Sequence, residues 1–69
     1  ISGDIIVWED FRNGNYDIYG YDLASKTEFP ICTDPAHQWA PAISADIVVW
    51  QDWRNGNWDI YGIRLSLGE

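Results

Sequence analysis

The sequence contains two copies of one unit, and the second copy begins 42 residues after the first. When Ile1 is aligned with Ile43, the overlap covers 27 positions, of which 16 are identical. A period of about 40 to 50 residues is typical of propeller blades and of helical solenoids. Such units bury their faces against neighbouring copies, so the two copies are expected to pack on each other. The identical residues of the first copy are Ile1, Ser2, Asp4, Ile5, Val7, Trp8, Asp10, Arg12, Asn13, Gly14, Asn15, Asp17, Ile18, Tyr19, Gly20 and Leu23.

Runs of β-branched and aromatic residues predict that the unit is built from strands. The second copy has such runs at 46–51 and 58–65, and the first copy repeats them at 4–9 and 16–23. A weaker strand is predicted at 28–33, where Pro30 indicates an edge or irregular strand. A short strand at 40–44 leads into the second copy. Because no segment has a helical period, a complete unit is predicted to be four strands.

The two longer strands of each copy are joined by Asp-x-Arg-Asn-Gly-Asn. Asn-Gly supplies two residues that tolerate positive φ, which predicts a tight hairpin. Residues 34–41 contain two prolines and are predicted to form a loop.

The pattern resembles the TolB-type β-propeller repeat. The motifs that carry the resemblance are Val7-Trp8, Asp10, Arg12-Asn13-Gly14-Asn15, Asp17-Ile18-Tyr19 and Pro41-Ala42-Ile43-Ser44. They recur at Val49-Trp50, Asp52, Arg54-Asn55-Gly56-Asn57 and Asp59-Ile60-Tyr61. The same stretches are similar to repeats of large archaeal cell-surface and surface-layer proteins.

This resemblance covers the whole chain and implies an all-β fold of antiparallel four-stranded β-propeller blades in tandem. Residues 1–39 would form a first blade with its loop, and residues 40–69 a second blade that lacks the last strand, together about one and two-thirds blades of one propeller. Because propellers contain about four to eight blades, the expected partners are further blades of the same repeat or other copies of this chain.

The polar turns could bind Ca²⁺ through carboxylate and amide oxygens. The alternative, which we favour, is that Asp and Asn cap turn amides while Arg12 and Arg54 pair with carboxylates. An arginine among the ligands works against a cation. The residues concerned are Asp10, Asn13, Asn15, Asp17, Asp52, Asn55, Asn57 and Asp59.

The chain has 11 aromatic residues, and some of them could stack on sugar rings. Those inside strands are expected to be buried: Trp8, Tyr19, Trp50 and Tyr61. Those near loops are expected to form a contact surface: Phe11, Trp39 and Trp53. Tyr16 and Trp58 complete the set that could form a sugar-stacking surface.

No residue pattern predicts catalysis. Cys32 is interpreted as a small apolar core residue, and His37 as a surface or turn residue. The adjacent acids Glu9 and Asp10 resemble a glycosidase pair, but neighbouring strand residues point to opposite faces and the second copy has Gln51 in place of Glu9. The chain is therefore not expected to be an enzyme, and no cofactor is predicted.

The net charge of −7 argues against binding to nucleic acid or to anionic membranes. No apolar run is long enough to span a membrane. The chain contains no Met and begins inside the repeat pattern, so we interpret it as a mature, excised or partial sequence. We expect a non-enzymatic scaffold repeat of an exported cell-surface protein. The alternative is a ligand-binding domain, such as a lectin-like carbohydrate-binding domain, or the accessory propeller of an enzyme.

Overall fold

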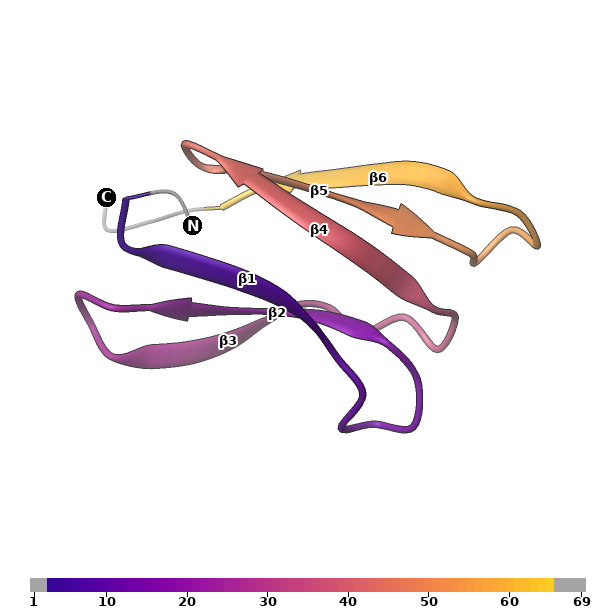
Figure 1. Cartoon of the computed structure of the whole chain (residues 1–69), viewed down its shortest axis with the longest axis horizontal. Helices are drawn as coiled ribbons and strands as arrows, with labels where there is room; N and C mark the ends of the chain where they lie inside the picture. The colour runs from indigo at the N-terminus through magenta and orange to yellow at the C-terminus, as the bar shows by residue number, and fades with distance from the viewer. Residues whose placement is uncertain (1–2, 66–69) are drawn as a thin grey trace.

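The computed structural model describes residues 3–65 and shows an all-β fold, as the sequence predicts (Figure 1). The strands form two three-stranded antiparallel sheets with the orders β1-β2-β3 and β4-β5-β6. No helix in the described residues is long and apolar enough to cross a membrane. The strands are β1 (Ile5–Asp10), β2 (Asp17–Asp22), β3 (Thr27–Cys32), β4 (Gln38–Ser44), β5 (Ile47–Asp52) and β6 (Asp59–Arg64).

The sequence repeat is also a structural repeat. In the β1–β2 hairpin Ile5 pairs with Asp22 and Asp10 pairs with Asp17. In the β5–β6 hairpin the residues 42 places later, Ile47 with Arg64 and Asp52 with Asp59, pair in the same register. Because a shift of one residue would reverse the faces of every side chain, equivalent residues occupy equivalent faces in the two hairpins.

Each sheet contains three strands among the described residues, rather than the four of a complete predicted unit. At one edge the first sheet ends with β1, whereas the second sheet has β4 beside the equivalent strand β5. At the other edge the second sheet ends with β6, whereas the first sheet has β3 beside the equivalent strand β2. In the first copy, the end of the predicted strand 40–44 corresponds to Ile1 and Ser2, which lie outside the described residues. The assignment of the sheets to blades of one propeller stays a prediction.

The hairpin connections are longer than Asn-Gly alone predicts. The first runs from residue 11 to 16, between the end of β1 and the start of β2. Gly14 donates its N–H to the Phe11 carbonyl at 3.1 Å and has a φ of 90°. Gly56 has the same role in the second copy, with a φ of 81°. Only the glycine of each Asn-Gly pair takes a positive φ, because the turn closes over Phe11–Gly14 rather than over Asn-Gly itself.

The irregular strands are those that contain proline. β3, which contains Pro30, lies at a sheet edge and its register with β2 shifts between Ile18 and Tyr19, as predicted. The strand β4 begins at Gln38, not at Ala40, so the predicted loop 34–41 is wrong over residues 38–41, which belong to the strand. The strand tolerates Pro41 because it too lies at an edge and its register with β5 shifts between Trp39 and Ala42. Ala40 has a φ of 52° there.

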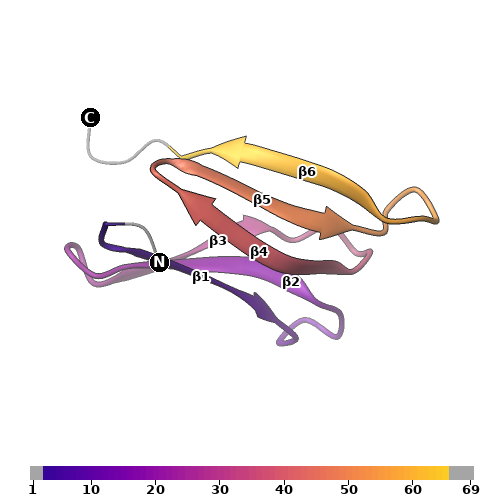
Figure 2. The same cartoon turned by 45° about the horizontal axis from the view of Figure 1, so that its top comes forward.

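The two sheets stack face to face, and β4 contacts both β1 and β2 (Figure 2). The first sheet buries the face that carries Val7 and Ile18, which we call the Ile18 face. The second sheet buries the opposite face of its equivalent strands, which carries Val48 and Trp50 and is called the Val48 face. Ile18 and Val48 are fully buried, and Trp50 is 5% exposed. The predicted packing of one copy on the other is confirmed, and it joins two different faces of the same unit.

Candidate functional site

Each hairpin turn is organised by one carboxylate at the end of its first strand. Asp10 accepts hydrogen bonds from the Trp8 indole N–H and from the backbone N–H and the Nε and Nη2 of Arg12, all at 2.9 Å. Asp52 accepts the equivalent bonds from Trp50 at 3.0 Å and from Arg54 at 2.7 to 2.9 Å. The predicted capping of turn amides by Asp and the pairing of both arginines with carboxylates are confirmed.

A second carboxylate closes each turn from the other strand. Asp17 accepts a hydrogen bond from the side-chain amide of Asn13 and another from that of Asn15, both at 2.9 Å. The Asn13 amide also donates to the Tyr19 hydroxyl at 3.1 Å, and the Arg12 guanidinium lies 4.0 Å from the centroid of the Tyr19 ring. The second copy repeats these contacts with Asn55, Asn57, Asp59, Arg54 and Tyr61.

The ion pairs keep both carboxylates charged. Hydrogen bonds from Arg12, and then from Trp8, hold the pKa of Asp10 well below its usual range. Burial raises the pKa of Asp52, but hydrogen bonds from Arg54 and Trp50 outweigh burial and lower it to about 2. Bonds to Glu28 and Asp10 raise the pKa of Arg12, and bonds to Asp52 raise that of Arg54. Both members of each ion pair are therefore charged at neutral pH.

The same contacts bear on the predicted calcium sites. Both oxygens of Asp10 and of Asp52 are engaged by arginine, and the asparagine side chains present N–H groups to Asp17 and Asp59. A cation would have to displace an arginine from each turn. Among residues 3–65 no group of three or more His, Cys, Asp or Glu side chains could hold a metal ion. Calcium binding stays a prediction that the observed hydrogen bonds do not favour.

The segment between β3 and β4 contacts both turns: it makes several hydrogen bonds with the first turn, and its His37 carbonyl accepts the Trp53 backbone N–H of the second turn at 3.0 Å. The Asn15 amide donates to the carbonyls of Asp34 at 3.2 Å and Ala36 at 3.1 Å. The backbone N–H of Tyr16 donates to Nδ1 of His37 at 3.2 Å, and the Gln38 N–H donates to the Tyr16 carbonyl at 2.8 Å. His37 is therefore a turn residue, as predicted, and it accepts a backbone hydrogen bond.

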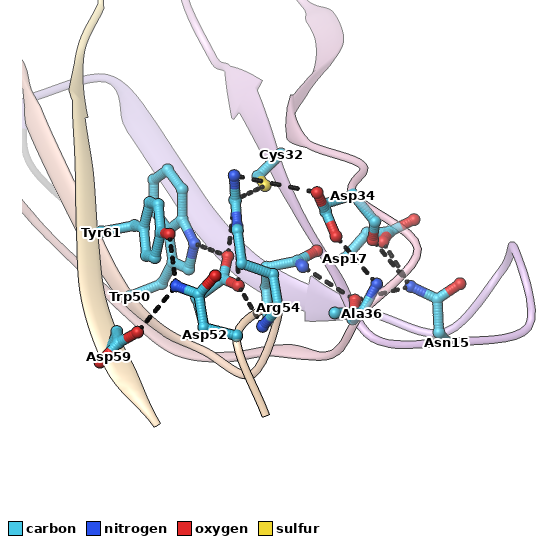
Figure 3. Close-up of polar contacts among 12 residues, drawn as sticks. Asn15, Asp17, Cys32, Asp34, Ala36, Trp50, Asp52, Arg54, Asp59 and Tyr61 are labelled. Carbon is cyan, nitrogen blue, oxygen red and sulfur yellow. Dashed lines mark hydrogen bonds and ion pairs between the residues drawn. The ribbon is translucent and has the colours of Figure 1, made fainter. Parts of the chain in front are cut away.

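Arg54 joins the two sheets in a way that Arg12 does not (Figure 3). Its Nη2 lies 3.3 Å from the sulfur of Cys32, and its Nη1 lies 3.8 Å from Asp34. Arg12 instead binds Glu28 of its own sheet at 2.6 Å. Cys32 is half-buried and packs against the core, where burial raises the pKa of its thiol. This environment agrees with the predicted structural role of the cysteine.

The aromatic residues near the turns form one continuous row along both sheets. Phe11 contacts Tyr16 edge to face, Tyr16 stacks on Trp39, Trp39 stacks on Trp58, and Trp58 contacts Trp53 edge to face. The successive ring centroids are 4.9 to 6.1 Å apart. Tyr16, His37, Trp39 and Trp58 line a groove of about 160 Å³.

The three aromatic residues predicted to form a contact surface are all in this row, and all are exposed. The exposed fractions are 54% for Phe11, 43% for Trp39 and 42% for Trp53. Trp58 is exposed to a similar extent, 44%; it was predicted to belong to the sugar-stacking set but not to the contact surface near the loops. The signal that could have identified it is its position directly before β6, in the same turn as Trp53. Of the aromatic residues predicted to be buried, Trp50 is buried, whereas Trp8, Tyr19 and Tyr61 are half-buried.

Comparisons of the chain with protein-family models, with curated proteins and with solved structures give no match. The resemblance to the TolB-type repeat therefore depends on the motifs of the sequence alone.

Proposed function

We propose that the chain is a non-enzymatic repeat module of an exported cell-surface protein, where it acts as a structural and protein-interaction scaffold built from TolB-type propeller blades. The observation that supports this most is the burial of Ile18, Val48 and Trp50 between two copies of the same unit. Units that bury their faces on one another are suited to extended scaffolds.

The polar residues of both turns support the same proposal, because their charges are used within the turns. Asp10 and Asp52 are bound by arginine and have lowered pKa values, so they are poor proton donors at neutral pH. Glu9, the other member of the acid pair, accepts the backbone N–H of Ala40 at 3.0 Å. It thereby links β1 to β4 rather than facing Asp10.

The single lysine allows a direct test of the surface location. Lys26 is exposed in the turn between β2 and β3. A membrane-impermeant amine reagent applied to intact source cells should label the peptide that contains Lys26, which mass spectrometry would detect. A cytoplasmic marker protein, which the reagent reaches only in broken cells, serves as the control for lysis. Labelling of Lys26 only after the cells are broken would contradict the proposed location.

A second candidate function is carbohydrate binding by the aromatic row. It is favoured by the exposure of Trp39, Trp53 and Trp58, whose rings are available for stacking on sugars. Soluble oligosaccharides should then change the tryptophan fluorescence, and Trp39→Ala should reduce the affinity. Leu23→Ala, an exposed apolar change outside the row, is the matched control. Equal responses of the two variants would remove this candidate.

A further inference from the structure

The two copies of the unit differ most in which face is covered. On the second sheet, the face equivalent to the Ile18 face carries Val49 and Ile60 and is called the Ile60 face. Ile18 is fully buried, but Ile60 is 72% exposed. Val7 packs against the core, but Val49 is 39% exposed. The second sheet thus leaves open the face that the first sheet buries.

The first sheet shows the reverse pattern on its other side. There the face equivalent to the Val48 face carries Ile6 and Trp8 and is called the Ile6 face. Val48 is fully buried, whereas Ile6 is 36% exposed. Leu65 packs against the core, but Leu23, its equivalent, is 45% exposed. Each open face is therefore equivalent to one side of the interface that already exists inside the chain.

Charge distinguishes the open Ile60 face from its covered equivalent, the Ile18 face. Glu9 and Asp22 accompany the Ile18 face, since they alternate in phase with Val7 and Ile18 along the paired strands. The corresponding residues of the Ile60 face are Gln51 and Arg64. Two carboxylates are thus replaced by an amide and a guanidinium. This change favours contact with a chain whose net charge is −7.

We infer that the Ile60 face of one chain binds the Ile6 face of a second copy of this chain, in the arrangement by which the Ile18 face binds the Val48 face inside each chain. This inference rests on the proposed scaffold function and names the partner of its open faces. The interface joins two different faces, so it is heterologous. An open assembly of any length therefore keeps an Ile60 face at one end and an Ile6 face at the other. Repetition of such a contact gives a ring if the rotation closes and a filament if it does not.

The arrangement can be tested with two variants that each block one face. In Ile60→Asp the Ile60 face is blocked and the Ile6 face is intact, whereas Ile6→Asp has the reverse combination. Sedimentation at micromolar concentration should show assemblies for the wild-type chain and only the 7.9 kDa monomer for each variant. An equimolar mixture of the two variants should form a dimer and nothing larger, because only one pair of intact faces remains.

Several results would overturn the inference. A wild-type chain that stays monomeric contradicts it, as do variants that assemble like the wild type, which would indicate pairing at the open edges of β1 and β6. A dimer formed by one variant alone would indicate an interface between identical faces, and variants that stay monomeric when mixed would show that the Ile60 face does not bind the Ile6 face. Circular dichroism of each variant checks that the fold is retained, and Leu23→Asn, a milder change on the Ile6 side, replaces Ile6→Asp if that variant unfolds. None of these outcomes affects the labelling of Lys26, so the scaffold proposal and this inference can fail separately.

Discussion

The two hairpin turns have nearly the same sequence and the same internal hydrogen bonds, but they have different neighbours. In the first copy Asn15 and Tyr16 bind the segment between β3 and β4, and Arg12 turns toward Glu28 of its own sheet. In the second copy Arg54 reaches across to Cys32 of the first sheet and to Asp34 of the segment that follows it. The comparison shows that the motif fixes the turn itself, while the partner of its outer surface depends on the position of the copy in the array.

The largest difference between equivalent residues is expected for Ile18 and Ile60. Ile18→Ala should lower the free energy of unfolding by about 2 to 5 kcal/mol, because it leaves a cavity between the sheets. Ile60→Ala should change it by less than about 0.5 kcal/mol, because the side chain is mostly exposed. Urea unfolding at the lowest usable protein concentration measures both changes in the free energy of unfolding. Equal losses would show that the Ile18 face is not buried as described.

A smaller difference is expected between the carboxylates of the two turns. Asp52 is fully buried and accepts four hydrogen bonds, so Asp52→Ala should lower the free energy of unfolding by about 2 kcal/mol. The side chain of Asp10 is 15% exposed, so Asp10→Ala should lower the free energy of unfolding by less than Asp52→Ala does. Parallel urea titrations of the two variants decide this, and a larger loss for Asp10 would reverse the predicted order.

The dependence of stability on pH should follow from the same carboxylates. The pKa of Asp52 is lowered to about 2 in the folded chain, from an ordinary value of 3.8. A lowered folded pKa contributes stability above the unfolded pKa, and this contribution is lost as the pH falls from about 4 through about 2. Asp10 and Glu28, whose pKa values are also lowered, should add to this loss. In Asp52→Asn the decline of the urea midpoint below pH 4 should be shallower, and an unchanged decline would contradict the assignment to Asp52.

The smallest effects are expected for the outer partners of the two arginines. Asp34→Asn weakens the contact of Arg54 between the sheets but keeps an acceptor for the Ala36 N–H. It should lower the free energy of unfolding by at most about 1 kcal/mol, and less at high salt. Glu28→Gln should have a still smaller effect, because Arg12 retains Asp10. Thermal melts at two salt concentrations test the pair, and a loss that does not depend on salt would argue against an ionic contribution.

The local structure was largely predictable from the sequence. The runs of β-branched and aromatic residues predicted β1, β2, β5 and β6, and Pro30 predicted the irregular edge strand β3. The extension of β4 to Gln38 was not predictable from propensity, because Pro41 and the preceding loop residues argue against a strand. It depends on a bulge at Ala40 and on the bond from its N–H to Glu9 of the other sheet. Such a contact between residues far apart in the chain cannot be recognised from the local sequence.

The candidate site was predictable in its residues but not in its connections. The turn motifs indicated that Arg12 would pair with a nearby carboxylate, and the loop positions indicated that Phe11, Trp39 and Trp53 would form a contact surface. That these rings join through Tyr16 and Trp58 into one row depends on how the sheets stack. The exposure of Ile60 could not be predicted either, because Ile60 and the buried Ile18 lie in the same Asp-Ile-Tyr-Gly sequence.

The central claim is that one copy packs on the next through two different faces of the same unit. Nuclear Overhauser contacts in an isotope-labelled chain test it most directly, at a concentration at which the chain is monomeric. The account predicts contacts from the Ile18 methyl groups to Val48 and to the Trp50 ring, and none from Ile60 to Ile6 or Trp8 until the concentration is raised. Absence of the Ile18 contacts in a folded monomer would contradict it.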